Sequence, residues 1–254
     1  MDTEPQRSSK WLFEHERCAD FTLRVWGDRA AFKRYDTPAE AQTYPMVTPA
    51  AAHGILSSIY WHPGVHYDVT CLCVLHPVQV YVTLGNEINK HAGRGGMDIG
   101  HSGNRTQRYR EVISRPAYLI SARVVVGGMH SREEYQAERG KALGIFTRRA
   151  ANGQCHERPY LGLREYAANF EPATQGDVPW DADADLGPVP LRLHKQPFPG
   201  GPLQLDQYEH DPDVRKWNKV RCEGRAVKSF MEGIVRRGMM PVPFNFGSEL
   251  LWGA

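Results

Sequence analysis

The 254-residue chain has 41% hydrophobic and 24% charged residues, an ordinary globular composition that excludes an intrinsically disordered protein. Its formal net charge of +2 indicates no class of partner, and five cysteines without a CxxC pair argue against a disulfide framework or a zinc knuckle. No apolar run reaches the ~18 residues of a transmembrane helix, and residues 1–19 lack the apolar core of a secretory signal. We therefore expect a cytoplasmic protein with reduced thiols and no membrane contact.

The N-terminal part predicts a tail, a strand, a loop and a helix, in that order. Residues 1–19 lack apolar periodicity and are expected to be a disordered tail. Apolar and polar side chains alternate over 20–26, as in a half-buried strand. A long loop with several basic and aromatic residues is expected over 28–48. A Thr-Pro pair then supplies an N-cap and a first helical residue for a helix over 50–61.

The middle of the chain predicts strands around a glycine-rich insertion. Runs rich in β-branched residues predict strands over 65–75, 78–84 and 118–126. Cys71 and Cys73 lie in the first run at a spacing of two, so we expect both thiols to be buried on one strand face. Residues 85–116 contain six basic and three acidic residues with little apolar periodicity, and we interpret them as a basic, irregular insertion.

Two further elements are expected before residue 171. Ser131 and Glu134 have the spacing of a capping box, but the glycines at 140 and 144 weaken a helix there, so the helix is expected over 141–152. A strand is expected over 160–170. The order of strand, helix, two strands, helix and strand fits an α+β fold, with a ferredoxin-like domain of the RNA-recognition type over 20–170.

Charge is unevenly distributed in the last third of the chain. Residues 171–213 carry nine acids against two bases, whereas 215–237 carry eight bases against two acids. A solvated face explains the acidic stretch as well as a binding site does. The basic stretches, here and in 85–116, are interleaved with aromatic residues and glycines, a pattern that favours contact with nucleic acid.

Three side chains are candidates for chemistry. His53 and Tyr60 are seven residues apart, which in a helix places them on one face about 10 Å apart along the axis; a tyrosine that simply packs at a helix end is the competing explanation. Lys141 follows a glycine at the expected helix start, where a bound phosphate would suit the helix dipole; the alternative is a solvated lysine. The sequence has no P-loop and no HExxH spacing, so no metal site and no cofactor are expected.

Several short motifs occur in a fixed order: Arg24-Val-Trp-Gly-Asp28, Thr48 to Pro63 with Ile59-Tyr-Trp61 inside it, Asn104-Arg-Thr-Gln-Arg108, Gly140-Lys141, Phe146-Thr-Arg-Arg149 and Pro159-Tyr-Leu-Gly-Leu-Arg-Glu165. In this order they resemble CRISPR-associated protein 5 of subtype I-C systems. The resemblance implies the ferredoxin-like domain and a small β-rich C-terminal domain, here 171–254. It also implies antiviral defence by metal-free cleavage of the repeat hairpin in CRISPR precursor RNA. The protein would then stay on the 5′ handle of the guide in the Cascade complex, beside its backbone and large subunits.

The resemblance implies roles for individual residues as well. The family cleaves with the tyrosine of an Ile-Tyr-Trp motif and the lysine and histidine of a Gly-Lys-His motif. Tyr60 and Lys141 match these positions, but Ala142 stands where the family has histidine. For RNA binding we expect basic and aromatic side chains of the matched motifs and the 28–48 loop, namely Arg24, Lys33, Arg34, Tyr44, Arg105, Arg108, Arg148, Arg149 and Arg164.

Metal-free cleavage uses the ribose 2′-hydroxyl as nucleophile, so the site must remove its proton, neutralise the phosphorane and protonate the 5′ oxygen. Lys141 suits the neutralisation and Tyr60 a proton transfer. Three explanations for the alanine at 142 stay open. Tyr60 and Lys141 cut slowly alone, or the protein only binds the guide, or the missing imidazole is replaced by His53, His130 or His156. Binding of target DNA or other duplex DNA by a basic groove is a further alternative.

Overall fold

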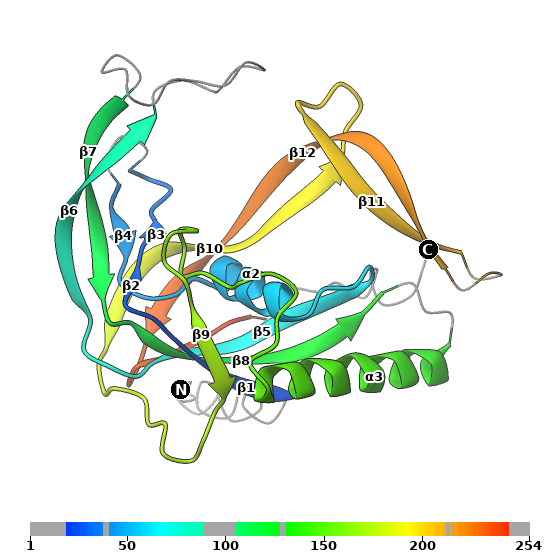
Figure 1. Ribbon diagram of the computed structural model, residues 1–254, viewed down its shortest axis with the longest axis horizontal. Coiled ribbons are helices and arrows are strands. Elements are labelled where there is room, and N and C mark those ends of the chain that lie inside the picture. Colours follow the sequence, from blue (N-terminus) through cyan, green and yellow to red (C-terminus); the bar gives the residue numbers. More distant parts are fainter. Residues whose placement is uncertain are drawn as a thin grey trace, which may run out of the picture.

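The computed structural model describes residues 19–37, 41–88, 105–127, 131–211, 214 and 216–243. Most of the predicted tail, residues 89–104 of the predicted insertion, and His130 lie outside these ranges. Within them the chain is mostly antiparallel sheet with two helices (Figure 1). The predicted α+β class is therefore confirmed. Neither helix in the described ranges is long and apolar enough to span a membrane.

A five-stranded antiparallel sheet forms the centre of the molecule, in the order β13-β5-β8-β1-β9. Its members are β1 (Phe21–Trp26), β5 (Val65–Val74), β8 (Ala117–Val126), β9 (Asn169–Pro172) and β13 (Met239–Pro241). The first three are predicted strands and are confirmed. The strand predicted over 160–170 is wrong. Gly162 has a φ of +84°, and a Cβ at this position would collide with the Ala31 carbonyl, so the chain turns there and becomes a strand only at β9.

Both helices pack on the same face of this sheet. The Tyr67 ring of β5 lies 6.5 Å from the His53 ring of α2 (Pro49–Ile59) and 5.3 Å from the Phe146 ring of α3 (Arg132–Ala151), measured between ring centroids. Because one strand side chain meets both helices, the helices share that side of the sheet. The helix predicted over 50–61 is confirmed as α2.

The second helix begins earlier than predicted. α3 starts at Arg132 instead of 141 because the Ser131 side chain caps it, accepting a hydrogen bond of 3.1 Å from the Glu134 amide. Acidic side chains in its first turn also suit the helix dipole. These contributions, with the packing of its inner face, offset the glycines at 140 and 144, which cost about 1 kcal/mol each relative to alanine.

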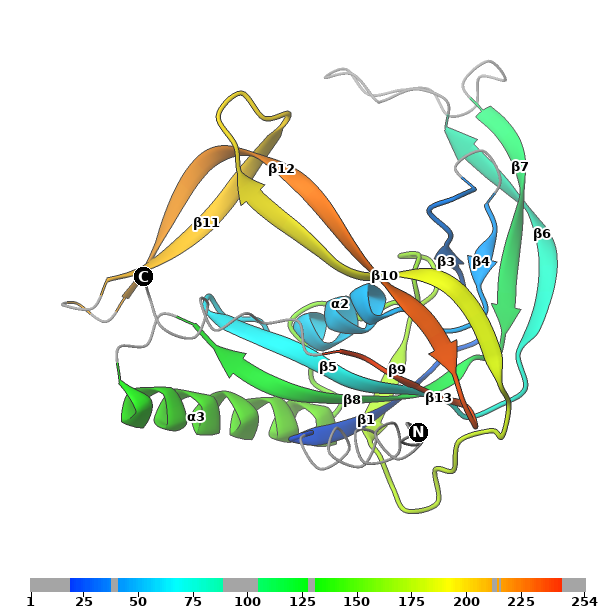
Figure 2. The same cartoon turned by 180° about the vertical axis from the view of Figure 1, so that it is seen from behind.

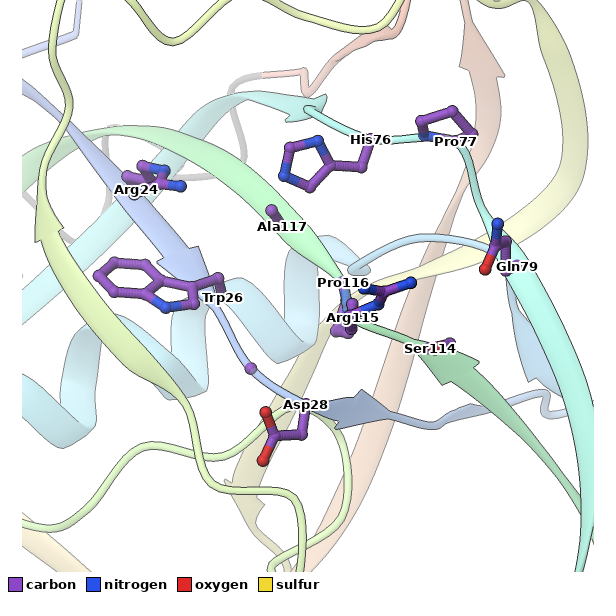
Figure 3. A pocket seen from close by; sticks show the side chains of 11 residues that line it. Arg24, Trp26, Asp28, His76, Pro77, Gln79, Ser114, Arg115, Pro116 and Ala117 are labelled. Atoms are coloured by element: carbon purple, nitrogen blue, oxygen red, sulfur yellow. The ribbon is translucent and has the colours of Figure 1, made fainter.

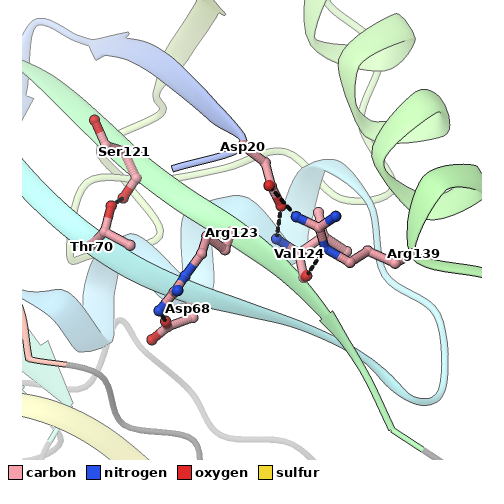
Figure 4. Close-up of polar contacts among 7 residues, drawn as sticks. All are labelled: Asp20, Asp68, Thr70, Ser121, Arg123, Val124 and Arg139. Atoms are coloured by element: carbon pink, nitrogen blue, oxygen red, sulfur yellow. Dashed lines mark hydrogen bonds and ion pairs between the residues drawn. The ribbon is translucent and has the colours of Figure 1, made fainter. Parts of the chain in front are cut away.

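One ion pair attaches α3 to the sheet, and a second joins two neighbouring strands of the sheet (Figure 4). Arg139 of α3 donates to the Val124 carbonyl at 3.1 Å and pairs with Asp20, whose carboxylate also accepts from the Val124 amide at 2.8 Å. Asp68 of β5, only 3% exposed, pairs with Arg123 directly across from it on β8. The N-terminal half of α3 is therefore fixed to the sheet by charge as well as by apolar packing.

The face of the sheet away from the helices holds a smaller apolar cluster of Cys71, Cys73 and Leu119. The two sulfurs are 3.9 Å apart, and both residues are buried, so the predicted buried thiols are confirmed. A register shift between Val69 and Cys71 reverses which side chains of β5 face the helices.

A long ribbon extends from one side of the centre. β6 (Gln79–Ile88) pairs with β7 (Arg105–Ser114), and β7 also pairs with β2 (Arg29–Ala30) (Figure 1). The irregular insertion predicted over 85–116 is therefore wrong for its described residues. Its strands are fixed by cross-strand partners distant in sequence, such as Leu84 and Tyr109, which a local pattern does not reveal.

A second three-stranded sheet arches away from the other side (Figure 2). It consists of β10 (Ala184–Pro197), β11 (Leu203–Asp211) and β12 (Lys216–Val235), with β12 in the middle. Val189 and Val235 at its base belong to the main core, and β13 joins the central sheet. The hydrophobic core thus continues across residue 170, where the boundary between two domains is predicted.

The loop predicted over 28–48 is largely packed into the core. It contains β2 and the short pair β3 (Phe32–Lys33) and β4 (Thr43–Tyr44). Tyr44 is fully buried, and its hydroxyl donates to the Pro188 carbonyl at 2.7 Å. The prediction that Tyr44 stacks on RNA is therefore corrected: its ring is a core side chain.

Candidate active site

Tyr60 is the C-cap of α2 and has already left the helix, with φ −138° and ψ 117°. Its amide donates to the Leu56 carbonyl at 3.2 Å, and its own carbonyl accepts a hydrogen bond of 2.7 Å from the Tyr67 hydroxyl. These bonds fix the backbone, while the half-buried phenol ring extends beyond the helix end.

His53 does not share a face with the Tyr60 ring, because helical spacing no longer applies once Tyr60 is extended. Its imidazole lines a small hollow together with Asp68 and Arg192, between α2 and β10. The helical spacing from which His53 was predicted therefore does not hold at Tyr60, and a catalytic role of His53 stays a prediction.

One cation of α3 faces the Tyr60 ring, and a second, Lys141, acts on the phenol through its charge. The Arg149 guanidinium lies 5.1 Å from the ring centroid and donates to the Ile59 carbonyl at 3.0 Å. Lys141 is close enough for its charge to act on the Tyr60 hydroxyl. The Lys141 side chain is 66% exposed and its ammonium lies 3.4 Å from a Glu138 carboxylate oxygen. The structure thus places Arg149 against the Tyr60 ring, and a joint role of Tyr60 and Lys141 stays a prediction.

The protonation of Tyr60 follows from its surroundings. Burial is the largest influence and raises its pKa above the ordinary value of 10, while Lys141 and Arg149 oppose the rise and Glu138 adds to it. At neutral pH the phenol is therefore protonated. It can donate a hydrogen bond or a proton beside two cations, which is a suitable environment for a phosphate whose negative charge grows during a reaction.

Ala142 lies on a different face of α3 from Lys141. It is 3% exposed and belongs to the core with Phe146 and Ala150, at spacings of four residues. Side chains at these spacings share one face of a helix, so a side chain at 142 enters the core. No imidazole could reach the phenol from this position without a change in how α3 packs.

An aromatic cluster adjoins Tyr60, and of its members sequence reasoning had named His156 as a possible replacement imidazole but missed the cluster itself. Trp61 stacks against His156 with ring centroids 6.1 Å apart, and meets Tyr208 of β11 edge-on at 5.3 Å. The His156 amide donates to the carbonyls of Ser58 and Ile59, which places this residue beside the end of α2. The Ile-Tyr-Trp motif hinted at Trp61, but nothing in the sequence pointed to Tyr208.

The remaining predicted RNA-binding residues are dispersed. Arg148 and Arg149 lie on the last turn of α3. Arg34 is engaged with Asp36 at 2.8 Å. Lys33, Arg108 and Arg164 are exposed at other places on the surface, and the side chain of Arg105 lies outside the described part. Among the predicted RNA-binding residues that the structure describes, Arg149 is the one found against the Tyr60 ring.

Arg24 lines a hollow of about 470 Å³ on the face of the sheet opposite the helices (Figure 3). Leu23 and Val25 face the core, so Arg24 and Trp26, which alternate with them, face the other way. The Arg24 guanidinium lies 4.7 Å from the Trp26 ring centroid and pairs with Glu171 and Asp177. Arg24 is thus separated from Tyr60 by the sheet.

A second large hollow, of about 790 Å³, lies between the β6–β7 ribbon and the segment around residues 158–169. Arg29, Arg110 and Arg158 contribute to its lining, with Arg110 paired to Glu165. Asp28 also lines it, so three arginines stand against two carboxylates, and the two arginines without an ion pair among the described residues make the hollow a candidate surface for a phosphate backbone. Across the described ranges, no three His, Cys, Asp or Glu side chains gather in a group that could hold a metal ion.

The sequence and the fold were compared with known proteins. A family model described as "CRISPR-associated protein (Cas_Cas5)", in its Cas5d form, matches residues 21–235. The CRISPR pre-crRNA endoribonuclease Cas5d of Thermus thermophilus is 32% identical over 233 residues, covering 91% of this chain and 95% of that protein. The protein of the same name from Mannheimia succiniciproducens is 33% identical over 242 residues, covering 90% and 96%.

Solved structures that match this chain agree with the family match at the level of the fold. A crystal structure of a CRISPR-associated protein matches with a TM-score of 0.55 at 21% identity, covering 91% of this chain and 93% of that one. A functionally uncharacterized protein from Streptococcus mutans matches with a TM-score of 0.53 at 21% identity, covering 88% and 91%. The chain belongs to the Cas5d family of CRISPR-associated proteins, the Cas5 type of subtype I-C.

Proposed function

We propose that this protein cleaves the repeat hairpin of CRISPR precursor RNA without a metal, and then stays on the 5′ handle of the guide as a subunit of type I-C Cascade in the cytoplasm. The names of both curated relatives support RNA processing in CRISPR defence. The observation that carries the proposal for this chain is the Arg149 guanidinium lying over the Tyr60 ring, with the charge of Lys141 also acting on the protonated phenol.

Each residue has a separate task in the proposed reaction. The 2′-oxygen attacks the adjacent phosphorus and the P–O5′ bond breaks, leaving a 2′,3′-cyclic phosphate and a 5′-hydroxyl. Tyr60 donates a proton or hydrogen bond to the departing 5′ oxygen, which its raised pKa permits at neutral pH. Lys141 and Arg149 neutralise the phosphorane. The proton of the 2′-hydroxyl passes to water, so we expect slow turnover.

The rest of the RNA requires a larger surface. The hollow lined by Arg29, Arg110 and Arg158, together with Asp28 and Glu165, is a candidate track for its backbone, and the exposed arginines at 108, 148 and 164 are further positive groups elsewhere on the surface. We further infer that the central sheet is a ferredoxin-like domain. Support comes from the chain order β1, α2, β5, β8, α3, β9 and from the sheet order β5-β8-β1-β9.

A non-catalytic role is the second candidate. The observation that favours it is the buried alanine at 142, which leaves the family's histidine position without an imidazole. In this case the protein would hold the 5′ handle through the same cations and cut nothing.

A cleavage assay in EDTA distinguishes the two. If the protein cleaves, wild-type protein should convert repeat RNA to a product with a 2′,3′-cyclic phosphate. One 2′-deoxy nucleotide at the cut should abolish the reaction. Lys141→Ala should then lower the single-turnover rate by about 10²–10³-fold, whereas Lys228→Ala on the distant β12 serves as the control. RNA that is bound but stays intact would overturn the nuclease and support the binding subunit; preference for duplex DNA over the hairpin would overturn both.

A further inference from the structure

A shallow hollow of about 300 Å³ adjoins Tyr60 on the side of Trp61. It is lined by Ser57, Ser58, Trp61, His156 and Glu157. Trp61 is 42% exposed, although His156 and Tyr208 brace its ring from two directions. A tryptophan held in place by its neighbours and still open to solvent presents a rigid flat surface to a ligand.

The backbone makes this hollow a fixed structure. The amides of His156 and Glu157 both donate to the Ser58 carbonyl at 2.9 Å, and the His156 amide also lies 3.1 Å from the Ile59 carbonyl. The segment that carries the imidazole and the carboxylate is therefore bonded directly to the last turn of α2, which also positions Tyr60. Because Trp61 is the next residue, its Cα lies about 3.8 Å from that of Tyr60.

The charge in the hollow indicates which part of a nucleotide would enter it. Glu157 is exposed and forms no ion pair with any side chain in the described ranges. A carboxylate repels phosphate and accepts hydrogen bonds only from N–H or O–H groups. An aromatic surface next to an acceptor-only group therefore suits a nucleobase, stacked through its face and bonded at its edge.

We propose that Trp61 and Glu157 form a pocket for one unpaired guanine beside the scissile phosphate. Guanine is chosen because N1–H and the 2-amino group are two neighbouring donors that a carboxylate accepts in parallel. The pocket would set the cut by fixing one base next to Tyr60. This inference rests on the proposed RNA binding and deepens it, since it adds the base that the site reads.

The test is a binding experiment that does not depend on cleavage. Repeat RNA is made with 2′-fluoro nucleotides, which cannot be cut, and a single abasic nucleotide is moved along it. Binding is measured by fluorescence anisotropy for wild-type protein, Trp61→Ala and Trp180→Ala. The Trp180 side chain is 38% exposed, which is similar to Trp61, but its backbone amide donates to the Val74 carbonyl of β5 and it does not line the hollow. It is therefore a matched control. Thermal melting confirms that each variant is folded.

Trp61→Ala should weaken binding of the intact RNA by about 5- to 150-fold, the range expected for one stacked base. One abasic position should weaken wild-type binding to the same extent and leave Trp61→Ala unchanged, whereas Trp180→Ala should behave as wild type. At that position, inosine, which lacks the 2-amino group, should weaken wild-type binding but not that of Glu157→Ala.

The outcomes separate the two proposals. If wild-type protein does not bind repeat RNA, the proposed function fails. If it binds and no abasic position is coupled to Trp61, the pocket alone is overturned. A coupled position that prefers a base other than guanine would overturn the assignment of guanine to Glu157.

Discussion

His66 makes the stability of this protein sensitive to acid. It lies on β5, next to the tyrosine whose hydroxyl supports the Tyr60 backbone. Burial is the main cause that lowers its pKa from 6.5 to about 4, and the charge of Arg192 adds to the effect. The folded protein therefore holds a neutral imidazole at pH values where the unfolded chain is already protonated.

Protonation of His66 in the unfolded chain lowers the free energy of unfolding in acid. Between pH 6.5 and about 4 the unfolded state binds the additional proton, so the free energy of unfolding falls as the pH falls. One pH unit corresponds to about 1.4 kcal/mol per proton, so the whole interval corresponds to about 3 kcal/mol for His66. This is a large part of the 5–15 kcal/mol typical of a folded domain.

Urea unfolding of wild type and His66→Gln, repeated from neutral pH down to about 4, measures this contribution. The wild-type free energy of unfolding should fall more steeply, with the difference between the two proteins changing by about 3 kcal/mol. Parallel curves for wild type and His66→Gln would refute the reasoning, because they would mean that the folded state does not hold His66 neutral.

Three further substitutions test the site and its supports. Arg149→Met should raise the pKa of Tyr60 further, since Arg149 is one of the two cations that lower it. The phenol is titrated by its absorbance at 295 nm, with Tyr60→Phe used to identify the signal of Tyr60, and an unchanged titration would contradict this. Ala142→His should destabilise the fold by about 1–3 kcal/mol through overpacking, measured by urea unfolding, and should not speed cleavage; a stable, faster enzyme would show that 142 can face the site. Gly64→Ala should destabilise by at least about 1–2 kcal/mol, because φ is +79° and the added Cβ meets the Trp217 ring; Gly140→Ala, with open space around its Cβ, is the control and should be neutral or stabilising.

The sequence alone was sufficient where structure depends on neighbouring residues. The Thr-Pro cap and apolar stripe of α2, and the β-branched runs of β5 and β8, are local signals, and the structure confirms all three elements. The ordered motifs were also enough to identify the family, which the comparisons confirm.

Other elements depended on partners far along the chain. The residues of β7 look like a basic loop until they pair with β6, and Tyr44 looks like a surface aromatic until β10 supplies the carbonyl that its hydroxyl requires. The attachment of the N-terminal half of α3 to the sheet depended on Arg139 reaching Asp20 and the β8 backbone. Such contacts leave no periodic trace in either segment alone.

The candidate site divides in the same way. The sequence singled out Tyr60 and Lys141 as candidates, because they stand in recognisable motifs. Only the tertiary structure decided how they act: Tyr60 leaves α2 as an extended cap, Arg149 comes to lie over its ring, and Ala142 turns into the core. Motifs specify the chemistry of single residues, whereas burial and charge around a phenol arise from packing between two helices far apart in the chain.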